Sequence, residues 1–418
     1  MKVLWLCNMI PSAVQENICG QKGSGLWIDS VLDGLRKMEN CQLRILCLSS
    51  QDCEGALDKK CSYVAFTEGL PYVYMSELEE KFRKELAQFC PDVIHIWGTE
   101  YGHTLAMVNA CEKSGLLDRI AVSIQGLCSV ISHHYAEGIP YAVHHGYTFR
   151  DLIRQDNIAQ QQKKFTLRGE LEVQALKKVR HIIGRTCWDE ACTNRVNPQA
   201  KYHYCNETLR EPFYEGNWQY ENCQKHRIFA SSCVYPIKGF HYLLEAFAEV
   251  VKVYPDATLA VPGNSCFANT PIERIRQSSY QKHLAKLIYQ YGLEDKVEFL
   301  GGLSAEKMKE NYLKANVFVL PSTIENSPNS LGEAMLLGVP CVASHVGGVT
   351  TMLEHEKEGY VYQPSAAYML AYYIKKVFSM GKDAENLGAA ARTHAQVTHD
   401  GKTNLETLLR IYEEIKER

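Results

Sequence analysis

The sequence predicts an α/β protein made of two doubly wound, Rossmann-like domains. Short apolar strands rich in β-branched residues alternate with amphipathic helices along the chain. That order is the one required by a parallel sheet with helices on both faces. The chain has 418 residues, 46% of them hydrophobic and 22% charged. It is therefore long enough to bury the cores of two domains of ordinary size.

The first domain is expected to span residues 1–205. Leu78, Phe82 and Leu86 lie four residues apart, so they mark the buried face of a helix. In order along the chain, we expect strands at 2–7 and 42–48, the helix at 78–89, and strands at 93–97 and 120–126. A helix at 169–181 then leads into a strand at 181–184.

The second domain is expected to span residues 206–399, because a new strand and helix alternation opens after the polar segment 206–214. Its first helix carries Phe240, Leu243 and Phe247 on one face. A last amphipathic helix lies within residues 400–418. In order, the expected elements are strand 227–230, helix 239–253, strand 258–261, helix 280–291, strands 296–300 and 317–320, helix 331–337, strand 341–344 and helix 405–415.

The stretch 317–348, VFVLPSTIENSPNSLGEAMLLGVPCVASHVGG, has the order of an anion-binding crevice. Pro321 stops a buried strand, a polar loop follows, and a helix then begins. In an open α/β sheet, ligands bind beyond the carboxyl ends of the strands, where helix amino termini present N–H groups to negative charge. The backbone amides of Asn329, Ser330 and Leu331 are therefore expected to face an anionic ligand.

Two carboxylates, Glu325 and Glu333, lie eight positions apart in this stretch. Ser330 and Glu333 also fit the S-x-x-E pattern of a capping box, so a purely structural role for Glu333 is an open alternative. Together with the loop and the following strand, the carboxylates resemble the E-x7-E signature of family 4 retaining nucleotide-sugar glycosyltransferases. That resemblance implies the GT-B fold, two Rossmann-like domains facing a cleft, with the last helix, within residues 400–418, packing back on the first domain. It also implies that Glu325 lies against the donor sugar and that Glu333 binds the ribose.

The join SSCVYPIKG, residues 231–239, resembles the G-R-x-x-x-x-K-G phosphate loop of the same family. Lys238 matches the lysine, and a cation at a helix start opposes the helix dipole, which argues for a bound anion. Ser232 belongs to the same donor loop, whereas Cys233 stands where the family usually has an arginine. The missing charge is expected from Arg210 at the hinge and Arg185 after a first-domain strand. The resemblance thus makes Glu325 and Lys238 the catalytic residues.

The loop after the first strand contains a glycine cluster that includes Gly23 and Gly25. Its spacing is G-x-x-G-x-G rather than G-x-G-x-x-G, so a nicotinamide dehydrogenase is a poor interpretation. In the family this loop touches donor phosphates or acceptor, and a turn without a ligand remains the alternative. Many relatives have a histidine where this chain has Gln125, which can position a hydroxyl but cannot titrate. His103, beyond a strand end, is the other residue expected to position acceptor or sugar.

Composition and charge limit the kinds of partner and cofactor that the sequence predicts. A net charge of −3 argues against an obligatory nucleic-acid partner. The sequence contains no run of about 18 apolar residues, the length needed to span a membrane. Six cations between residues 163 and 180 could touch an anionic membrane surface, although a solvated helix face is the simpler interpretation. The sixteen cysteines are scattered and show no zinc spacing, so we expect reduced thiols in the cytosol. No D-x-D pair occurs, which fits the family's metal independence, and no metal or cofactor is expected.

The sequence therefore predicts a retaining glycosyltransferase that moves a sugar from a nucleotide-diphosphate sugar to a glycan or lipid-linked acceptor in polysaccharide biosynthesis. We expect it in the cytoplasm, with peripheral contact to the inner face of the plasma membrane left open. Two alternatives remain at this point. One is a nucleotide-sugar epimerase of the same fold, and the other is a non-catalytic nucleotide-sugar-binding subunit, which the neutral residues Gln125 and Cys233 would suit.

Overall fold

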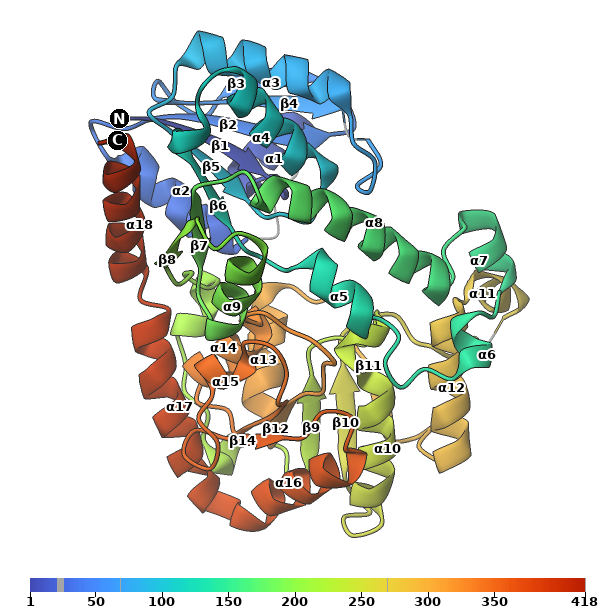
Figure 1. The fold of residues 1–418 in the computed structure, drawn as a ribbon. Helices are drawn as coiled ribbons and strands as arrows, with labels where there is room; N and C mark the ends of the chain where they lie inside the picture. The colour runs from blue at the N-terminus through green and yellow to red at the C-terminus, as the bar shows by residue number, and fades with distance from the viewer. Residues whose placement is uncertain (21–25, 68, 269, 418) are drawn as a thin grey trace. The chain divides into compact units, whose positions relative to one another are not determined.

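The structure is a computed structural model that describes residues 1–20, 26–67, 69–268 and 270–417. The chain forms two compact units, each built around its own sheet (Figure 1). The predicted class of two Rossmann-like α/β domains is confirmed. Unit 1 comprises Met1–Ser132, Lys164–Arg210 and Thr398–Arg418, and unit 2 comprises His133–Lys163 and Glu211–Val397.

In the described part of unit 1, eight strands form one sheet in the order β3-β4-β2-β1-β5-β6-β7-β8. Neighbouring strands run parallel, apart from β3 and β4, which pair antiparallel. The carboxyl ends of β5 to β8 therefore meet at one edge of the sheet. The strands are β1 Lys2–Cys7, β2 Gln42–Ser49, β3 Cys53–Ala56, β4 Cys61–Thr67, β5 Val93–Trp97, β6 Ile120–Ser123, β7 His181–Gly184 and β8 Lys201–Tyr204.

Helices cover both faces of this sheet, as the alternation of side chains along β1 requires. Trp5 points into one core with α2 and α18, and Leu4 and Leu6 point into the other with α3 and α4. On α18, the Tyr412 hydroxyl accepts a hydrogen bond from Trp5 Nε1 at 3.0 Å. The helices are α1 Ser12–Cys19, α2 Trp27–Lys37, α3 Ser76–Phe89, α4 Gly102–Lys113, α5 Cys128–His134, α8 Ile158–Leu176, α9 Cys187–Val196 and α18 Gly401–Lys416, with α5 and α8 continuing between the units.

In the described part of unit 2, six parallel strands form a sheet in the order β11-β10-β9-β12-β13-β14. The central strands β9 and β12 are fully buried. The strands are β9 Arg227–Ala230, β10 Thr258–Val261, β11 Val297–Phe299, β12 Val317–Leu320, β13 Cys341–Ser344 and β14 Tyr360–Tyr362. The helices are α6 Tyr141–His144, α7 Phe149–Arg154, α10 Phe240–Val251, α11 Pro271–Arg276, α12 Ser279–Tyr291, α13 Ala305–Lys314, α14 Asn329–Leu336, α15 Val349–Met352, α16 Ala367–Met380 and α17 Ala384–Thr398.

Residues 133–163, which lie inside the sequence-based domain 1–205, cluster with unit 2. Hydrogen bonds to the second sheet's helices and loops account for this. The Thr323 hydroxyl donates to the His134 carbonyl at 3.1 Å, and the buried carboxylate of Asp151 accepts the Ser279 amide at 2.9 Å. Among the described residues, no helix is long and apolar enough to cross a bilayer.

Several predicted boundaries shift, and two of the shifts affect the site. The strand expected at 120–126 ends at Ser123, so Gln125 lies in the loop beyond it. The helix expected from Gly239 begins at Phe240, and Lys238 ends a short 3-10 turn, Pro236–Lys238, instead of opening the helix. Gly239 takes a positive φ of 63° between the two, a conformation that favours glycine. The helix expected at 169–181 belongs to α8, which ends at Leu176, so the cations Lys177, Lys178 and Arg180 lie beyond its end.

Candidate functional site

The loops that follow β9 and β12 touch each other at the carboxyl edge of the second sheet. β9 and β12 are neighbours in the sheet, so the polar segments after Ala230 and Leu320 leave it side by side. They come close at Gly239, where a Cβ would lie 1.9 Å from the carbonyl oxygen of Pro321. The Thr323 amide donates to the Ile237 carbonyl at 2.9 Å. The two loops are thus fixed to each other through their backbones.

Lys238 and Glu325 meet at this junction. Lys238 Nζ lies 2.6 Å from Glu325 Oε1, and the Ser322 hydroxyl donates to the same oxygen at 2.7 Å. The Glu325 side chain is 11% exposed and the Lys238 side chain 32% exposed. An ammonium has three N–H donors, and the contact with Glu325 uses one of them. The partly exposed lysine therefore keeps donors for another acceptor.

The backbone of Glu325 is also held. Its carbonyl accepts the Gly348 amide at 3.1 Å, and a Cβ on Gly347 would lie 1.8 Å from the same oxygen. The Ser344 hydroxyl, at the end of β13, donates to the Ser322 carbonyl at 2.6 Å. Three neighbouring strand ends, those of β9, β12 and β13, thus contribute to the position of one carboxylate.

Glu333 is buried in α14, the helix that follows this loop. The helix begins at Asn329, two residues earlier than expected, and its N-cap is Pro328, which makes no side-chain capping bond. The capping-box interpretation of Ser330 and Glu333 is therefore wrong, because Ser330 lies inside the first turn. This leaves the burial of the Glu333 carboxylate without a capping explanation.

The first turn of α14 contains the three backbone amides that were expected to bind an anion, and one of them donates to a backbone carbonyl instead. The Leu331 amide donates to the Pro328 carbonyl at 2.9 Å, so it does not face a ligand as expected. Asn329 and Ser330 come before the first such bond, where a helix amide has no intrahelical acceptor. Both residues are partly exposed. The helix start thus offers two amides for an anion.

Cys233 takes no part in charge balance. It is 5% exposed, its thiol lies 3.5 Å from the Pro262 carbonyl, and burial raises its pKa to about 12. The thiol is therefore neutral at physiological pH. Ser232, beside it, is half-buried, and its hydroxyl accepts the Val234 amide at 3.4 Å. Within this loop, Lys238 supplies the cation.

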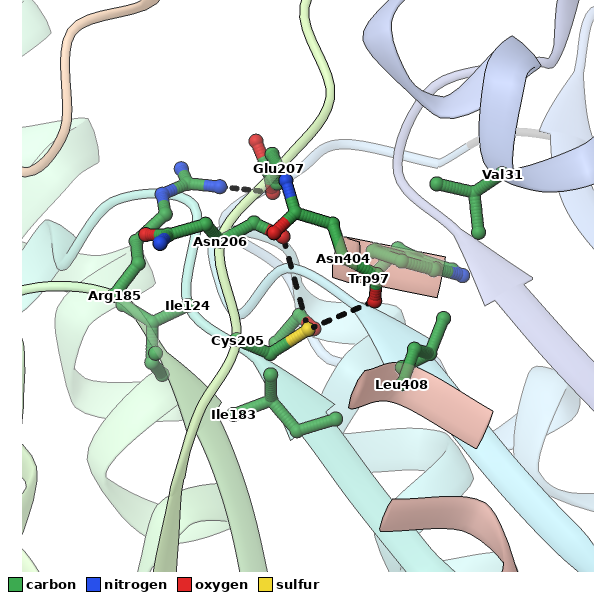
Figure 2. A pocket seen from close by; sticks show the side chains of 12 residues that line it. Val31, Trp97, Ile124, Ile183, Arg185, Cys205, Asn206, Glu207, Asn404 and Leu408 are labelled. Atoms are coloured by element: carbon green, nitrogen blue, oxygen red, sulfur yellow. Dashed lines mark hydrogen bonds and ion pairs between the residues drawn. The ribbon is translucent and has the colours of Figure 1, made fainter. Parts of the chain in front are cut away.

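In unit 1, three polar side chains from adjacent strand ends form a second cluster. Gln125 follows β6, Arg185 follows β7 and Glu207 follows β8. Arg185 pairs with Glu207, as Figure 2 shows, and also donates to Gln125 Oε1 at 3.3 Å. Gln125 Nε2 donates to Glu207 Oε1 at 2.5 Å. Burial lowers the pKa of Arg185 to about 10, so the guanidinium remains charged at neutral pH.

Two members of this cluster, Arg185 and Glu207, line a cavity of about 20 Å³ in unit 1. That volume holds one water molecule and neither a sugar nor a nucleotide. Trp97 Nε1, Arg185 Nε and Glu207 Oε2, which border the cavity, are buried without a hydrogen-bond partner in the described chain. Sequence reasoning missed Glu207, because the polar strand KYHY before it, β8, shows no apolar run. Arg185 is thus paired with a carboxylate within unit 1.

The other expected unit 1 residues are less suited to proton transfer. His103 is buried in the first turn of α4, with Nε2 2.7 Å from Asn8 Oδ1. Burial lowers its pKa to about 3, so it is neutral at physiological pH. Arg210 is half-buried at the end of the unit 1 segment. Gly23 and Gly25 lie outside the described residues.

One group among the described residues, His181, His203 and Glu414, brings three metal-ligating atoms within 4.8 Å of one another. It lies in unit 1, with His181 the first residue of β7, away from the carboxyl edge. His181 Nδ1 and His203 Nε2 are 2.9 Å apart, a hydrogen-bond distance. Two nitrogens each about 2.0 to 2.1 Å from a tetrahedral zinc would be roughly 3.3 Å apart. The arrangement fits a hydrogen-bonded histidine pair better than a zinc site.

Residues 221–394 match the profile of the family described as glycosyl transferases group 1. The chain carries a group 1 glycosyltransferase domain. The match covers the Lys238 and Glu325 junction and the whole of α14, and it confirms the resemblance seen in the sequence. Among curated proteins, the chain is 30% identical to an uncharacterized glycosyltransferase of Methanocaldococcus jannaschii over 142 residues, 34% of this chain and 33% of that protein.

Two further curated relatives also match part of the chain. Spore coat protein SA of Bacillus subtilis is 27% identical over 42% of this chain and 46% of its own length. The putative colanic acid biosynthesis glycosyltransferase WcaL of Escherichia coli is 32% identical over 29% of this chain and 31% of its own length. The chain thus spans between 31% and 46% of the length of these three relatives.

Solved structures show the same fold over nearly the whole chain. Sucrose-phosphate synthase from Thermosynechococcus elongatus has a TM-score of 0.69 at 17% identity and covers 99% of each chain. HepE of Anabaena, solved in complex with UDP, has a TM-score of 0.67 at 16% identity and covers 99% of this chain and 100% of its own. The glycosyltransferase domain of this chain therefore lies within a GT-B fold.

Proposed function

We propose that this protein transfers a sugar from a nucleotide-diphosphate sugar to a glycan or lipid-linked acceptor, with retention of configuration and without a metal ion. The observation that carries the proposal is the Lys238 and Glu325 pair, which joins the loops after β9 and β12 inside the glycosyltransferase segment. Two names support a cell-surface polysaccharide as the product, since relatives are called a colanic acid glycosyltransferase and a spore coat protein. HepE, of the same fold, has been solved with UDP-glucose.

In this proposal, unit 2 binds the donor. The amides of Asn329 and Ser330 and the remaining N–H groups of Lys238 would bind the diphosphate, which favours a helix amino terminus. Glu333, buried in α14, would accept hydrogen bonds from the ribose hydroxyls. Glu325, fixed by Ser322 and Lys238, would accept hydrogen bonds from the sugar.

The reaction needs little proton chemistry from the protein. The bond between the anomeric carbon and the diphosphate oxygen breaks, the acceptor oxygen bonds to that carbon on the same face, and its proton passes to the leaving phosphate oxygen. Negative charge develops on the diphosphate in the transition state, where preorganised donors such as Lys238 Nζ stabilise it most. Gln125 cannot titrate and His103 is buried with a pKa of about 3, so neither supports an acid or base role in unit 1.

The proposal also includes work at a membrane, because lipid-linked acceptors reside there. The expected place is the cytoplasmic face of the plasma membrane, with peripheral contact. The cations between residues 163 and 180 are the sequence feature that suggests this contact. Two of them form ion pairs, Lys178 with Glu112 and Arg180 with Asp118.

The test is to incubate the purified protein with a panel of nucleotide-diphosphate sugars, first alone and then with glycan acceptors, with and without EDTA. We expect one or two donors to raise the unfolding temperature, and the NMR coupling of the new glycosidic bond to show the donor's anomeric configuration. A ligand at 100 times its dissociation constant adds about 2.7 kcal/mol of stability. Conversion of the donor without acceptor would favour an epimerase, and binding without any turnover would favour a non-catalytic subunit.

A further inference from the structure

Helices α7 and α11 of unit 2 present apolar side chains to solvent. The two helices pack against each other and lie side by side in Figure 1. On α7 the apolar residues recur at i, i+3 and i+4, a pattern that normally faces a core. Contiguous exposed apolar patches on soluble proteins mark interaction sites. The residues are Phe149, Leu152 and Ile153 on α7 and Ile272 and Ile275 on α11, each at least 50% exposed.

The apolar face of α7 is held outward by a buried anchor on the same helix. Asp151, fully buried, accepts the Thr148 amide at 3.2 Å and the Ser279 amide at 2.9 Å. Arg150 pairs with Asp151 at 2.9 Å and with Asp156 at 3.5 Å. The bond to Ser279 fixes α7 to the start of α12, so the exposure of its apolar residues is a property of the folded unit rather than of a frayed end.

A basic groove lies next to this face, between α11 and α12. Its volume is about 520 Å³, and its lining includes the cations Arg274, Lys282 and Lys286 and the aromatic rings of Phe267 and Tyr289. No acidic residue is among the described residues that line it. Nor does any of the three cations form an ion pair within the described chain, whereas lysines elsewhere on unit 2 pair with nearby glutamates.

The acidic side chains near the groove already have hydrogen-bond or ion-pair partners. Glu273 accepts the Thr270 amide at 3.1 Å in the capping box of α11. Asp151 binds Arg150 and two backbone amides, and Asp156 binds Arg150. The groove therefore presents positive charge beside aliphatic and aromatic side chains. A nucleic acid would leave the aliphatic side chains without an apolar partner. A second copy of this face would place its own cations opposite these cations, and like charges repel.

We propose that α7, α11 and the groove beside them dock unit 2 on an anionic lipid bilayer. The apolar side chains enter the boundary between headgroups and acyl chains, and Arg274, Lys282 and Lys286 bind lipid phosphates in the groove. The inference deepens the membrane contact of the proposed function and moves it from residues 163–180 to this surface. It does not depend on which donor or acceptor the enzyme uses.

The experiment is co-sedimentation of the full-length protein with vesicles of phosphatidylcholine, alone or with phosphatidylglycerol, in the absence of substrates. We expect binding only to the anionic vesicles, weakened at about 0.5 M salt because screening shortens electrostatic reach. The triple variant Arg274→Ala, Lys282→Ala, Lys286→Ala should lose on the order of 10²-fold in partitioning, since each cation near an anionic surface contributes roughly fivefold. The triple variant Phe149→Ser, Leu152→Ser, Ile153→Ser should also lose binding, but without a change in its salt dependence.

Matched controls separate this surface from general charge and apolarity. Lys252→Ala, Lys307→Ala, Lys357→Ala removes three exposed lysines elsewhere on unit 2, and Val253→Ser, Tyr368→Ser, Tyr372→Ser removes three exposed apolar side chains. Both should bind vesicles like the wild type, and all variants should keep the wild-type unfolding temperature. Equal losses in the control variants would overturn the proposal. So would absence of vesicle binding together with self-association that the Phe149, Leu152 and Ile153 substitutions abolish. Failure of sugar transfer with vesicle binding intact would count against the proposed activity instead.

Discussion

Lys238 Nζ and Glu325 Oε1 lie 2.6 Å apart although the two residues are 87 positions apart in the chain. The contact joins the loop after β9 to the loop after β12 and uses one of the three N–H donors of Lys238. The contact couples ligand binding at Lys238 to Glu325, because the position of the ammonium that binds the ligand depends on Glu325. Substitutions at the two positions should therefore not be independent.

Replacing Glu325 by Gln is expected to separate sugar contact from nucleotide binding. Transfer should fall, because the carboxylate that faces the sugar in the proposal is lost. Affinity for the sugar-free nucleotide diphosphate should stay the same or rise, because Lys238 is released from its ion pair. Calorimetric titration with both ligands measures this. A matched loss of affinity for nucleotide with and without sugar would contradict the assigned position of Glu325.

Replacing Lys238 by Ala should lower turnover on the order of 10²-fold or more, by analogy with the loss of other preorganised donors to a developing anion. Cys233 is a neutral buried thiol, so it cannot substitute for the lost cation. Lys238→Arg, which keeps the charge, is the control and should retain part of the activity. If Lys238→Ala turns over like the wild type at saturating donor, the helix amides suffice to stabilise the diphosphate.

Replacing Glu333 by Gln should weaken binding of the nucleotide diphosphate by about 1.5 to 3 kcal/mol, the usual range for a hydrogen bond to a charged group. Because the N-cap of α14 is Pro328, loss of a capping box at Ser330 should not lower the unfolding temperature of this variant. Ser330→Ala is the control for capping and should leave stability unchanged. A variant that unfolds earlier but binds nucleotide normally would show that Glu333 serves the helix rather than the ribose.

The sequence predicted most of the second sheet because its strands are short apolar runs ended by strong signals. Val317–Leu320 stops at Pro321, and the strand Cys341–Ser344 follows Gly338 and Pro340, so local patterns suffice to locate the loop between them. The position of Lys238 was less predictable. Its 3-10 turn depends on the contact of Gly239 with Pro321, 82 positions later, which no local pattern reveals.

The unit 1 cluster was less predictable than the junction of Lys238 and Glu325 in unit 2. Gln125 and Arg185 follow apolar strands and were identified, but their partner Glu207 follows β8, whose sequence KYHY is polar. The edge position of β8 explains this, since an edge strand need not be apolar on both faces. Likewise, the capping-box pattern at Ser330 was present in the sequence, yet the helix begins earlier. A pattern of four residues does not fix where a helix starts.

The Arg185 and Glu207 pair gives a prediction about stability. Arg185→Ala leaves the Glu207 carboxylate, 7% exposed, without its cation, and breaking a buried pair in this way costs about 3 to 5 kcal/mol. The double variant Arg185→Met, Glu207→Leu should recover most of that loss, because no buried charge is left unpaired. Urea unfolding measures both. Should Arg185→Ala keep its stability and lose donor affinity, Arg185 would belong to the donor site, as the sequence indicates.

His103 gives a prediction about pH. Burial lowers its pKa to about 3, whereas in the unfolded chain it should titrate near 6.5, so below that pH the unfolded state binds a proton that the folded state does not. The folded state therefore loses up to about 1.4 kcal/mol for each pH unit below about 6.5, and roughly 2 kcal/mol by about pH 5.

Above about pH 6.5 both states are neutral at this position, so the histidine makes no pH-dependent contribution there. His103→Gln keeps a donor for Asn8 and cannot titrate, so the variant should lose less stability than the wild type between about pH 6.5 and pH 5. The comparison is between variants, because His95, also buried with a pKa of about 3, adds a slope of its own. Urea unfolding at both pH values gives the difference. Identical pH profiles for His103→Gln and the wild type would mean that His103 titrates normally in the folded protein and remains available to exchange protons.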